Sequence, residues 1–216
     1  MSSTKCITLE EELKKNAELK LSDIQILREW CEKQPHLPKI QDMELAIFLH
    51  CSYYHIETTK NKIENYYTYR THMPEIFSNR DVLKVKRLRD AFKVGAQLQL
   101  EGKTKEGYNI MLVRLVDPDP SNFFCNEFIS AAVMSCDEFS RSHGSPLEYI
   151  YIFDATGTTL GHVARLNISI IKKVLDSILD IIIVRMKGIH LIITSSIAEM
   201  GYNMIKPFIN AELINL

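Results

Sequence analysis

The pattern of hydrophobic and polar positions divides the chain into two regions. Before about residue 100, charged and apolar side chains recur at helical spacing, which predicts helices over Leu9–Leu19, Leu21–Gln34, Asp42–His50 and Thr58–Thr71. From about Tyr108, short apolar runs alternate with amphipathic stretches. The first region is therefore expected to be a helical bundle, and the second to combine strands with helices.

The second region is predicted to alternate strands and helices. Its apolar runs predict strands over Asn109–Val116, Tyr149–Phe153 and Gly188–Thr194, and its amphipathic stretches predict helices over Phe123–Ser142, Ser169–Ile183 and Ile197–Ile209. Strands joined through helices favour a mostly parallel sheet. Because the strands are apolar almost throughout, both faces of the sheet are expected to be covered. The predicted fold class is α/β, an N-terminal helical bundle followed by a mostly parallel sheet flanked by helices.

Composition and charge narrow the class of protein. The chain has 216 residues, of which 46% are hydrophobic and 25% charged, with a formal net charge of −1. These values fit a globular domain, and they provide no overall field that would attract nucleic acid. The basic run Lys84–Arg89 is interpreted as a solvated amphipathic segment. Charges throughout residues 1–20 leave no apolar stretch for a signal peptide, so a cytoplasmic location is expected.

The cysteines and histidines predict no metal site. The five cysteines are scattered, odd in number and without a CxxC pair: Cys6, Cys31, Cys51, Cys125 and Cys136. This arrangement favours reduced thiols over a disulfide framework or a zinc site. His50, Cys51 and His55 lie near one another in sequence, but their spacing does not place them on one helical face.

Asp154 is the only residue whose setting suggests catalysis. It follows an apolar strand and precedes Thr156, Gly157 and Thr158, a pattern similar to the aspartyl-phosphate loop of phosphoryl-transfer enzymes. That chemistry also needs a carboxylate after a later strand, where this chain has Thr194, Ser195 and Ser196. The alternative, that Asp154 caps a turn in which Gly157 supplies a positive φ, is favoured. The chain also lacks phosphate-binding glycine motifs and a nucleophile elbow, so no catalytic residues are assigned.

The last predicted helix has one apolar stripe, formed by Ile197, Met200, Met204, Ile205, Phe208 and Ile209. Periodicity alone supports a helix packed on the sheet. The methionines make the stripe adaptable, which suits a second interpretation, a lid over a cavity. Pro207 lies within the stripe and is expected to bend the helix near Lys206.

Five local strings in order resemble the CRAL-TRIO (Sec14-like) lipid-binding family, in particular its tocopherol- and retinal-binding branch. The strings are NYYTYR (65–70), MPEI (73–76), DATGTTLGH (154–162), RMKGIH (185–190) and MIKPF (204–208). The resemblance covers residues 20–216. It implies an N-terminal helical domain over residues 1–80, a linker with a basic helix over 81–107, and a lipid-binding domain over 108–216.

The resemblance implies a hydrophobic pocket between the sheet and the helices, closed by a gate helix. Its expected lining is Phe124, Phe128, Ala131, Phe153, Leu160, Leu166, Val174, Ile178, Ile182, Val184, Ile189, Ile205 and Phe208. The gate would carry Ile197, Met200, Met204, Ile205 and Phe208. The expected ligand is a small hydrophobic lipid such as a tocopherol or a retinoid, bound without a cofactor, and burial of its apolar surface would drive binding.

The resemblance also implies transient contact with membranes by a monomeric carrier that is not an enzyme. Arg185 and Lys187 keep the basic pattern of members that bind phosphoinositides, and they are the candidate contacts for that lipid. The family continues past the gate with further strand and helix, so the lipid-binding domain is expected to be shortened here. A second hypothesis from another class remains open, a non-transferring interaction module with a degenerate pocket.

Overall fold

The computed structural model describes residues 7–145 and 148–214, so Cys6 lies outside the described residues. The chain forms two compact units that interleave along the sequence. Of the described residues, the first unit takes in 7–72, 136–145 and 179–185, and the second takes in 73–135, 148–178 and 186–214. Each unit is therefore assembled from segments far apart in the chain.

The first unit is helical. It contains α1 (Leu9–Lys15), α2 (Leu21–Glu32), α3 (Asp42–Cys51) and α4 (Ile56–His72). Thr8 begins α1 with a capping box in which the side chains of Thr8 and Glu11 each accept a hydrogen bond from the other residue's backbone. Apolar side chains of α2, α3 and α4 form one core that includes Leu27, Phe48 and Ile63. This unit confirms the predicted N-terminal helices, with ends that differ by a few residues.

The second unit is built on a sheet. Among the described residues four strands pair in the order β1 (Gly95–Lys103), β2 (Asn109–Leu115), β3 (Tyr149–Asp154) and β4 (Met186–Ile192). β1 pairs with β2 antiparallel, whereas β2, β3 and β4 are parallel. The mostly parallel sheet confirms the predicted α/β class. No strand is expected over residues 95–103, because this segment lacks the continuous apolar character of the other strands. In the structure β1 is largely exposed.

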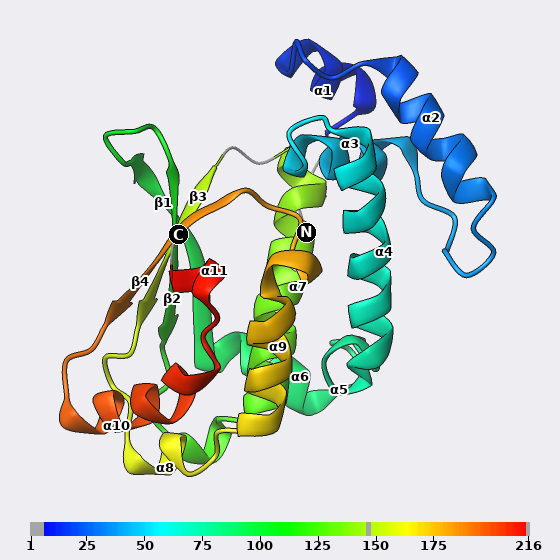
Figure 1. Ribbon diagram of the computed structural model, residues 1–216. Helices are drawn as coiled ribbons and strands as arrows, with labels where there is room; N and C mark the ends of the chain where they lie inside the picture. Colours follow the sequence, from blue (N-terminus) through cyan, green and yellow to red (C-terminus); the bar gives the residue numbers. More distant parts are fainter. Residues whose placement is uncertain (1–6, 146–147, 215–216) are drawn as a thin grey trace. The chain divides into compact units, whose positions relative to one another are not determined.

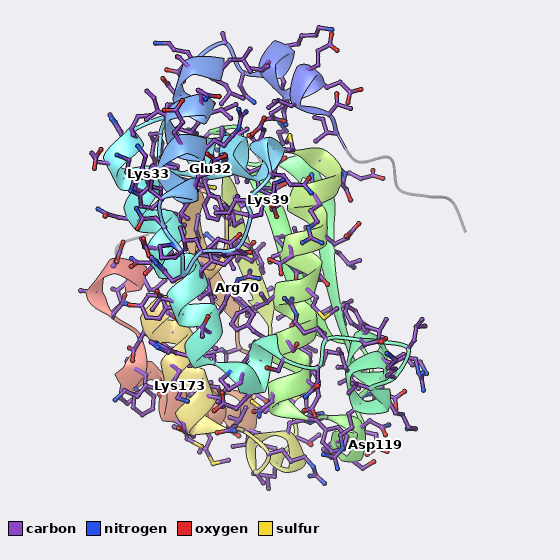
Figure 2. The ribbon with its side chains drawn as sticks, turned by 90° about the vertical axis from the view of Figure 1, so that its right-hand side faces the viewer. Glu32, Lys33, Lys39, Arg70, Asp119 and Lys173 are labelled. Atoms are coloured by element: carbon purple, nitrogen blue, oxygen red, sulfur yellow. The ribbon has the colours of Figure 1, made fainter. Side chains whose placement is uncertain are left out.

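Helices connect the strands. Strand β1 is preceded by α5 (Pro74–Phe77) and α6 (Lys86–Val94). Helix α7 (Cys125–His143) joins β2 to β3. The connection from β3 to β4 contains α8 (Leu160–Val163) and α9 (Ile168–Ile181). Figure 1 shows the first part of α7 and α9 on the same side of the sheet. This arrangement is expected when successive parallel strands are joined by crossovers of one handedness. Lys173 of α9, which is labelled in Figure 2, pairs with Glu75 of α5 at 3.1 Å.

The chain after β4 is helical. α10 (Ser196–Ile205) is followed by the 3-10 turn η2 (Lys206–Phe208) and by α11 (Ala211–Ile214). The predicted continuous helix Ile197–Ile209 is therefore wrong at its end, since the α-helix stops at Ile205. Pro207 explains the difference, because proline has no N–H to donate and its ring crowds the preceding turn. None of the helices in the described ranges is long and apolar enough to cross a membrane.

Candidate functional site

The second unit contains an apolar hollow between the sheet and α10. Its volume is about 270 Å³, and we call it the α10 hollow. Six elements contribute side chains to it: β2, β3, the end of β4, α7, α8 and α10. The lining residues are Val113, Arg114, Leu115, Phe123, Phe128, Phe153, Asp154, Ala155, Thr158, His162, Val163, Leu166, Leu191, Ile193, Ala198, Gly201, Tyr202 and Ile205.

Strand register brings the floor of the α10 hollow together. Val113 of β2 lies beside Phe153 of β3, and Phe153 lies beside Leu191 of β4. Successive residues of a strand point to opposite faces, so these three side chains form a row on one face of the sheet. Each comes from a strand that is apolar enough to be predicted, but the row exists only because of the register.

Small residues let α10 approach α8 closely. Ala198 and Gly201 are the buried positions of α10. A Cβ atom added at Gly201 would lie 3.3 Å from Cγ2 of Val163, which is tighter than an ordinary contact. The start of α10 is fixed by Ser195, whose side chain accepts a hydrogen bond from the backbone N–H of Ala198. α10 is therefore a well-formed wall of the hollow.

Four residues of the expected lining meet at the α10 hollow: Phe128, Phe153, Leu166 and Ile205. The others are elsewhere. Ala131 lines a separate hollow, Leu160 is 59% exposed, and Ile182 and Val184 belong to the first unit. Phe124 contacts Arg87, and Phe208 lies near Lys172. Three further residues are buried or half-buried but do not line the hollow: Val174, Ile178 and Ile189. Their assignment to a ligand stays a prediction.

Several lining residues were not anticipated, notably Val113, Phe123, Leu191 and Tyr202. A signal for two of them was present in the sequence. If Phe153 faces the pocket, its partner residues in the two neighbouring parallel strands face it as well. Which residues those partners are depends on the strand register, which cannot be read from the strands alone. Phe123 follows a proline-rich loop, and nothing in its local pattern marks it as a lining residue.

The apolar stripe of the expected gate is divided between two environments. Ile205 lines the hollow, and Ile197 and Phe208 are half-buried. Met200 and Met204 are exposed by 42% and 41%, so they present apolar surface to solvent. Buried Ala198 and Gly201, rather than the methionines, hold the helix against its neighbours in this structure.

Asp154 stabilises a turn at the rim of the hollow. Its Oδ1 accepts a hydrogen bond from the backbone N–H of Thr156 at 2.9 Å, and Gly157 has a φ of +85°. Hydrogen bonding from Thr156 lowers the pKa of Asp154, and so keeps its carboxylate ionised. Within residues 7–145 and 148–214, no three His, Cys, Asp or Glu side chains lie close enough together to hold a metal ion. The geometry is that of a capped turn.

His162 is buried beside this turn and is only 2% exposed. The backbone N–H of Thr159 approaches its Nδ1 at 3.2 Å, in the capping box that begins α8. A ring nitrogen that accepts a hydrogen bond carries no proton, so Nε2 is the protonated nitrogen of the neutral ring. Burial, reinforced by Arg165, lowers the pKa of His162 and so favours that neutral form. Its ring packs edge-on against Phe123 with centroids 5.4 Å apart.

The two candidate phosphoinositide contacts already have partners. In the first unit, Nε of Arg185 donates to the backbone carbonyl of His50 at 2.8 Å, and the guanidinium lies 4.0 Å from the ring centroid of Tyr53. In the second unit, Lys187 pairs with Glu148 at 2.9 Å. A phosphate group would have to compete with these contacts.

Comparison with known proteins gives two family matches and a set of relatives. Residues 96–215 match the family described as CRAL/TRIO domain, and residues 16–86 match the one described as Pinta-like, UBA domain. Relatives include the proteins named Alpha-tocopherol transfer protein-like from Mus musculus and from Homo sapiens. Each is 28% identical over 211 residues, which cover 95% of this chain and 60% of the relative. The chain thus spans about 60% of the length of the curated relatives that it matches.

Proposed function

The chain belongs to the CRAL/TRIO domain family, and from this premise we propose that it binds a small hydrophobic lipid in the α10 hollow and transfers it between membranes. The observation that carries the proposal is the apolar lining of the hollow, with three strands on one side and α10 on the other. Both the family and the transfer-protein-like relatives support lipid binding as the general activity.

The energetics of the site suit an apolar ligand. Burying apolar surface is worth about 25 cal/mol per Å². A ligand in contact with Phe128, Phe153 and Leu166 would have that part of its surface removed from water against apolar side chains. The polar lining groups lie mainly at the turn after β3, where Asp154, Thr158 and His162 are found. We therefore assign the apolar body of the lipid to the sheet side and any polar group to this rim.

We assign membrane contact to the outer surface of α10 and to α8. Met200, Met204 and Leu160 expose apolar side chains on these two elements, and α8 and α10 contact each other. Exposed apolar groups on a helix that also closes a pocket can enter the membrane interface as the helix moves. A phosphoinositide would add specificity through Arg185 and Lys187 only if it displaced their internal contacts.

Tocopherol is the first ligand to test, because the relatives named above carry it in their name. A retinoid or another lipid of similar size fits the proposal equally, since apolar linings select ligands by shape. The alternative function, an interaction module that holds no lipid, predicts that the purified chain neither retains nor takes up such ligands.

The test is native mass spectrometry of the purified chain, followed by titration with α-tocopherol. Ile205→Trp places a larger ring in the α10 hollow and should reduce uptake at least about tenfold, while Ile26→Trp makes the same change on α2 outside the hollow and should leave uptake unchanged. Equal uptake by both variants would place the ligand elsewhere. Absence of any bound lipid in the wild type would favour the interaction module.

A further inference from the structure

A second hollow lies next to the first in the same unit. Its volume is about 320 Å³, and it is formed by the end of α6, the first part of β1 and the inner face of α7. We call it the β1 hollow. Its lining residues are Ala91, Phe92, Lys93, Gly95, Ala96, Gln97, Leu98, Val113, Val116, Phe128, Ala131, Ala132 and Ser135. Two residues, Val113 and Phe128, line both hollows.

Phe128 is the larger of the two shared residues. Val113 is part of the sheet floor, whereas Phe128 projects from α7 and packs on Phe123 with ring centroids 5.3 Å apart. One edge of the ring, with Cδ2, Cε2 and Cζ, lies next to Gly95, the first residue of β1. The ring thus lies between the α10 hollow and the β1 hollow.

The glycine at position 95 is explained by this ring. Gly95 has a φ of −126°, an extended conformation that any residue adopts. A Cβ atom at this position would, however, lie 2.3 Å from Cε2 of Phe128 and 3.0 Å from Cζ. The absence of a side chain at Gly95 therefore provides the space that the ring of Phe128 occupies.

Resting on the proposed function, we propose that Phe128 divides one extended lipid site into two parts and so sets the longest alkyl chain that the protein accepts. Each hollow alone is near the lower limit of the ~300–1,000 Å³ typical of ligand pockets, whereas the two joined fall well inside that range. With the ring in place, a ligand fills the α10 hollow alone. Lipids whose alkyl chain ends within the α10 hollow are accepted, and longer chains are selected against.

The experiment measures affinity for straight-chain alcohols from decanol to eicosanol by displacement of a fluorescent fatty-acid probe. In the wild type, affinity should rise roughly fourfold for each added methylene until the α10 hollow is full, and then level off. Phe128→Ala should extend the rise by several methylenes, with Phe128→Leu in between. Phe139→Ala, the same truncation on α7 outside both hollows, should keep the wild-type limit.

A length limit that is identical in the wild type, Phe128→Ala and Phe128→Leu would overturn the proposal while leaving lipid binding intact. Failure of the wild type to bind any alcohol or α-tocopherol would instead overturn the proposed function, and this inference with it. Phe128→Leu retains most of the side-chain volume, so the comparison remains informative if Phe128→Ala does not fold.

The contact between Phe128 and Gly95 has its own test that needs no ligand. Gly95→Ala should lower the Tm of the wild type by roughly 3–6 °C, because the added methyl collides with the ring. In the Phe128→Ala background the same change should lower the Tm by less than half as much. Equal losses in the two backgrounds would show that the ring does not occupy the space beside Gly95, and would overturn the proposal.

Discussion

At the scale of single residues, His50 is the most unusual group of the helical unit. It lies in α3, is only 4% exposed, and its Nδ1 has no hydrogen-bond partner among the described residues. Burial, with the charges of Arg185 and Lys15 as secondary causes, lowers the pKa of His50 to about 3. The neutral ring fits the apolar interior, where a protonated ring would be a buried charge beside a guanidinium.

We predict that this histidine makes stability depend on pH. The unfolded chain binds a proton at His50 below about pH 6.5 whereas the folded chain does not, so the free energy of unfolding falls as the pH drops from about 6.5 towards 3. The slope is at most about 1.4 kcal/mol per pH unit. Urea unfolding at pH 7.5 and 5.5 should show a smaller difference for His50→Leu than for the wild type. Exposed His55→Leu, as a control, should retain the wild-type difference.

At the scale of an element, α10 has two distinct surfaces, one packed against the rest of its unit and one facing solvent. Ala198 and Gly201 pack inward and Ile205 lines the hollow, while Met200 and Met204 face solvent. Their exposure means that the methionines contribute little to folding, because surface substitutions away from special features are usually worth less than about 0.5 kcal/mol. The two surfaces can therefore be changed separately.

We predict that replacing both Met200 and Met204 by Asp separates lipid retention from lipid transfer. The carboxylates should repel anionic membranes and remove the apolar surface that enters the interface, so the rate of transfer between vesicles should fall at least about tenfold. Retention of bound lipid should stay within about twofold of the wild type. The exposed pair Leu21→Asp and Ile26→Asp on α2 introduces the same charge as a control. If both double variants transfer lipid at the wild-type rate, α10 is not the membrane contact.

At the scale of the whole molecule, one ion pair helps to join three segments of the helical unit. Arg70 near the end of α4 donates to both carboxylate oxygens of Asp137 on α7, at 3.0 and 2.6 Å, and to the backbone carbonyl of Ile181 at 2.8 Å. The guanidinium also lies 3.9 Å from the ring centroid of Tyr66. Arg70, which is labelled in Figure 2, thus links three segments far apart in the chain.

We predict that Arg70→Ala lowers the free energy of unfolding by about 3 kcal/mol. The side chains of Arg70 and Asp137 are only 13% and 17% exposed, so removing the arginine takes a charged hydrogen-bond donor away from a largely buried carboxylate. The pair between Arg28 and Asp42 provides the comparison, because its side chains are 39% and 36% exposed. Arg28→Ala should cost much less in the same urea titration, because exposed ion pairs contribute little to stability. Similar losses for the two variants would mean that Arg70 does not hold the segments together.

The sequence by itself determined the class of fold and most of the elements. Apolar runs such as residues 109–116 and 149–153 are strands in the structure, because a buried parallel strand needs apolar side chains on both faces. The turn at Asp154 and Gly157 was also predictable, since its hydrogen bond and its positive φ are local properties. The place where Pro207 disturbs the last helix was predictable for the same reason, although a bend was expected where the α-helix ends.

Only the tertiary structure decided which apolar residues form the site. Val113, Phe153 and Leu191 share a row because of strand register, a relation between segments that no single segment encodes. Ile182 and Val184 were expected in the lining but belong to the helical unit, which takes in residues 179–185. The space beside Gly95 is likewise a property of the packing of β1 against α7. Periodicity shows that a side chain is buried, but the partner against which it is buried depends on how distant segments pack.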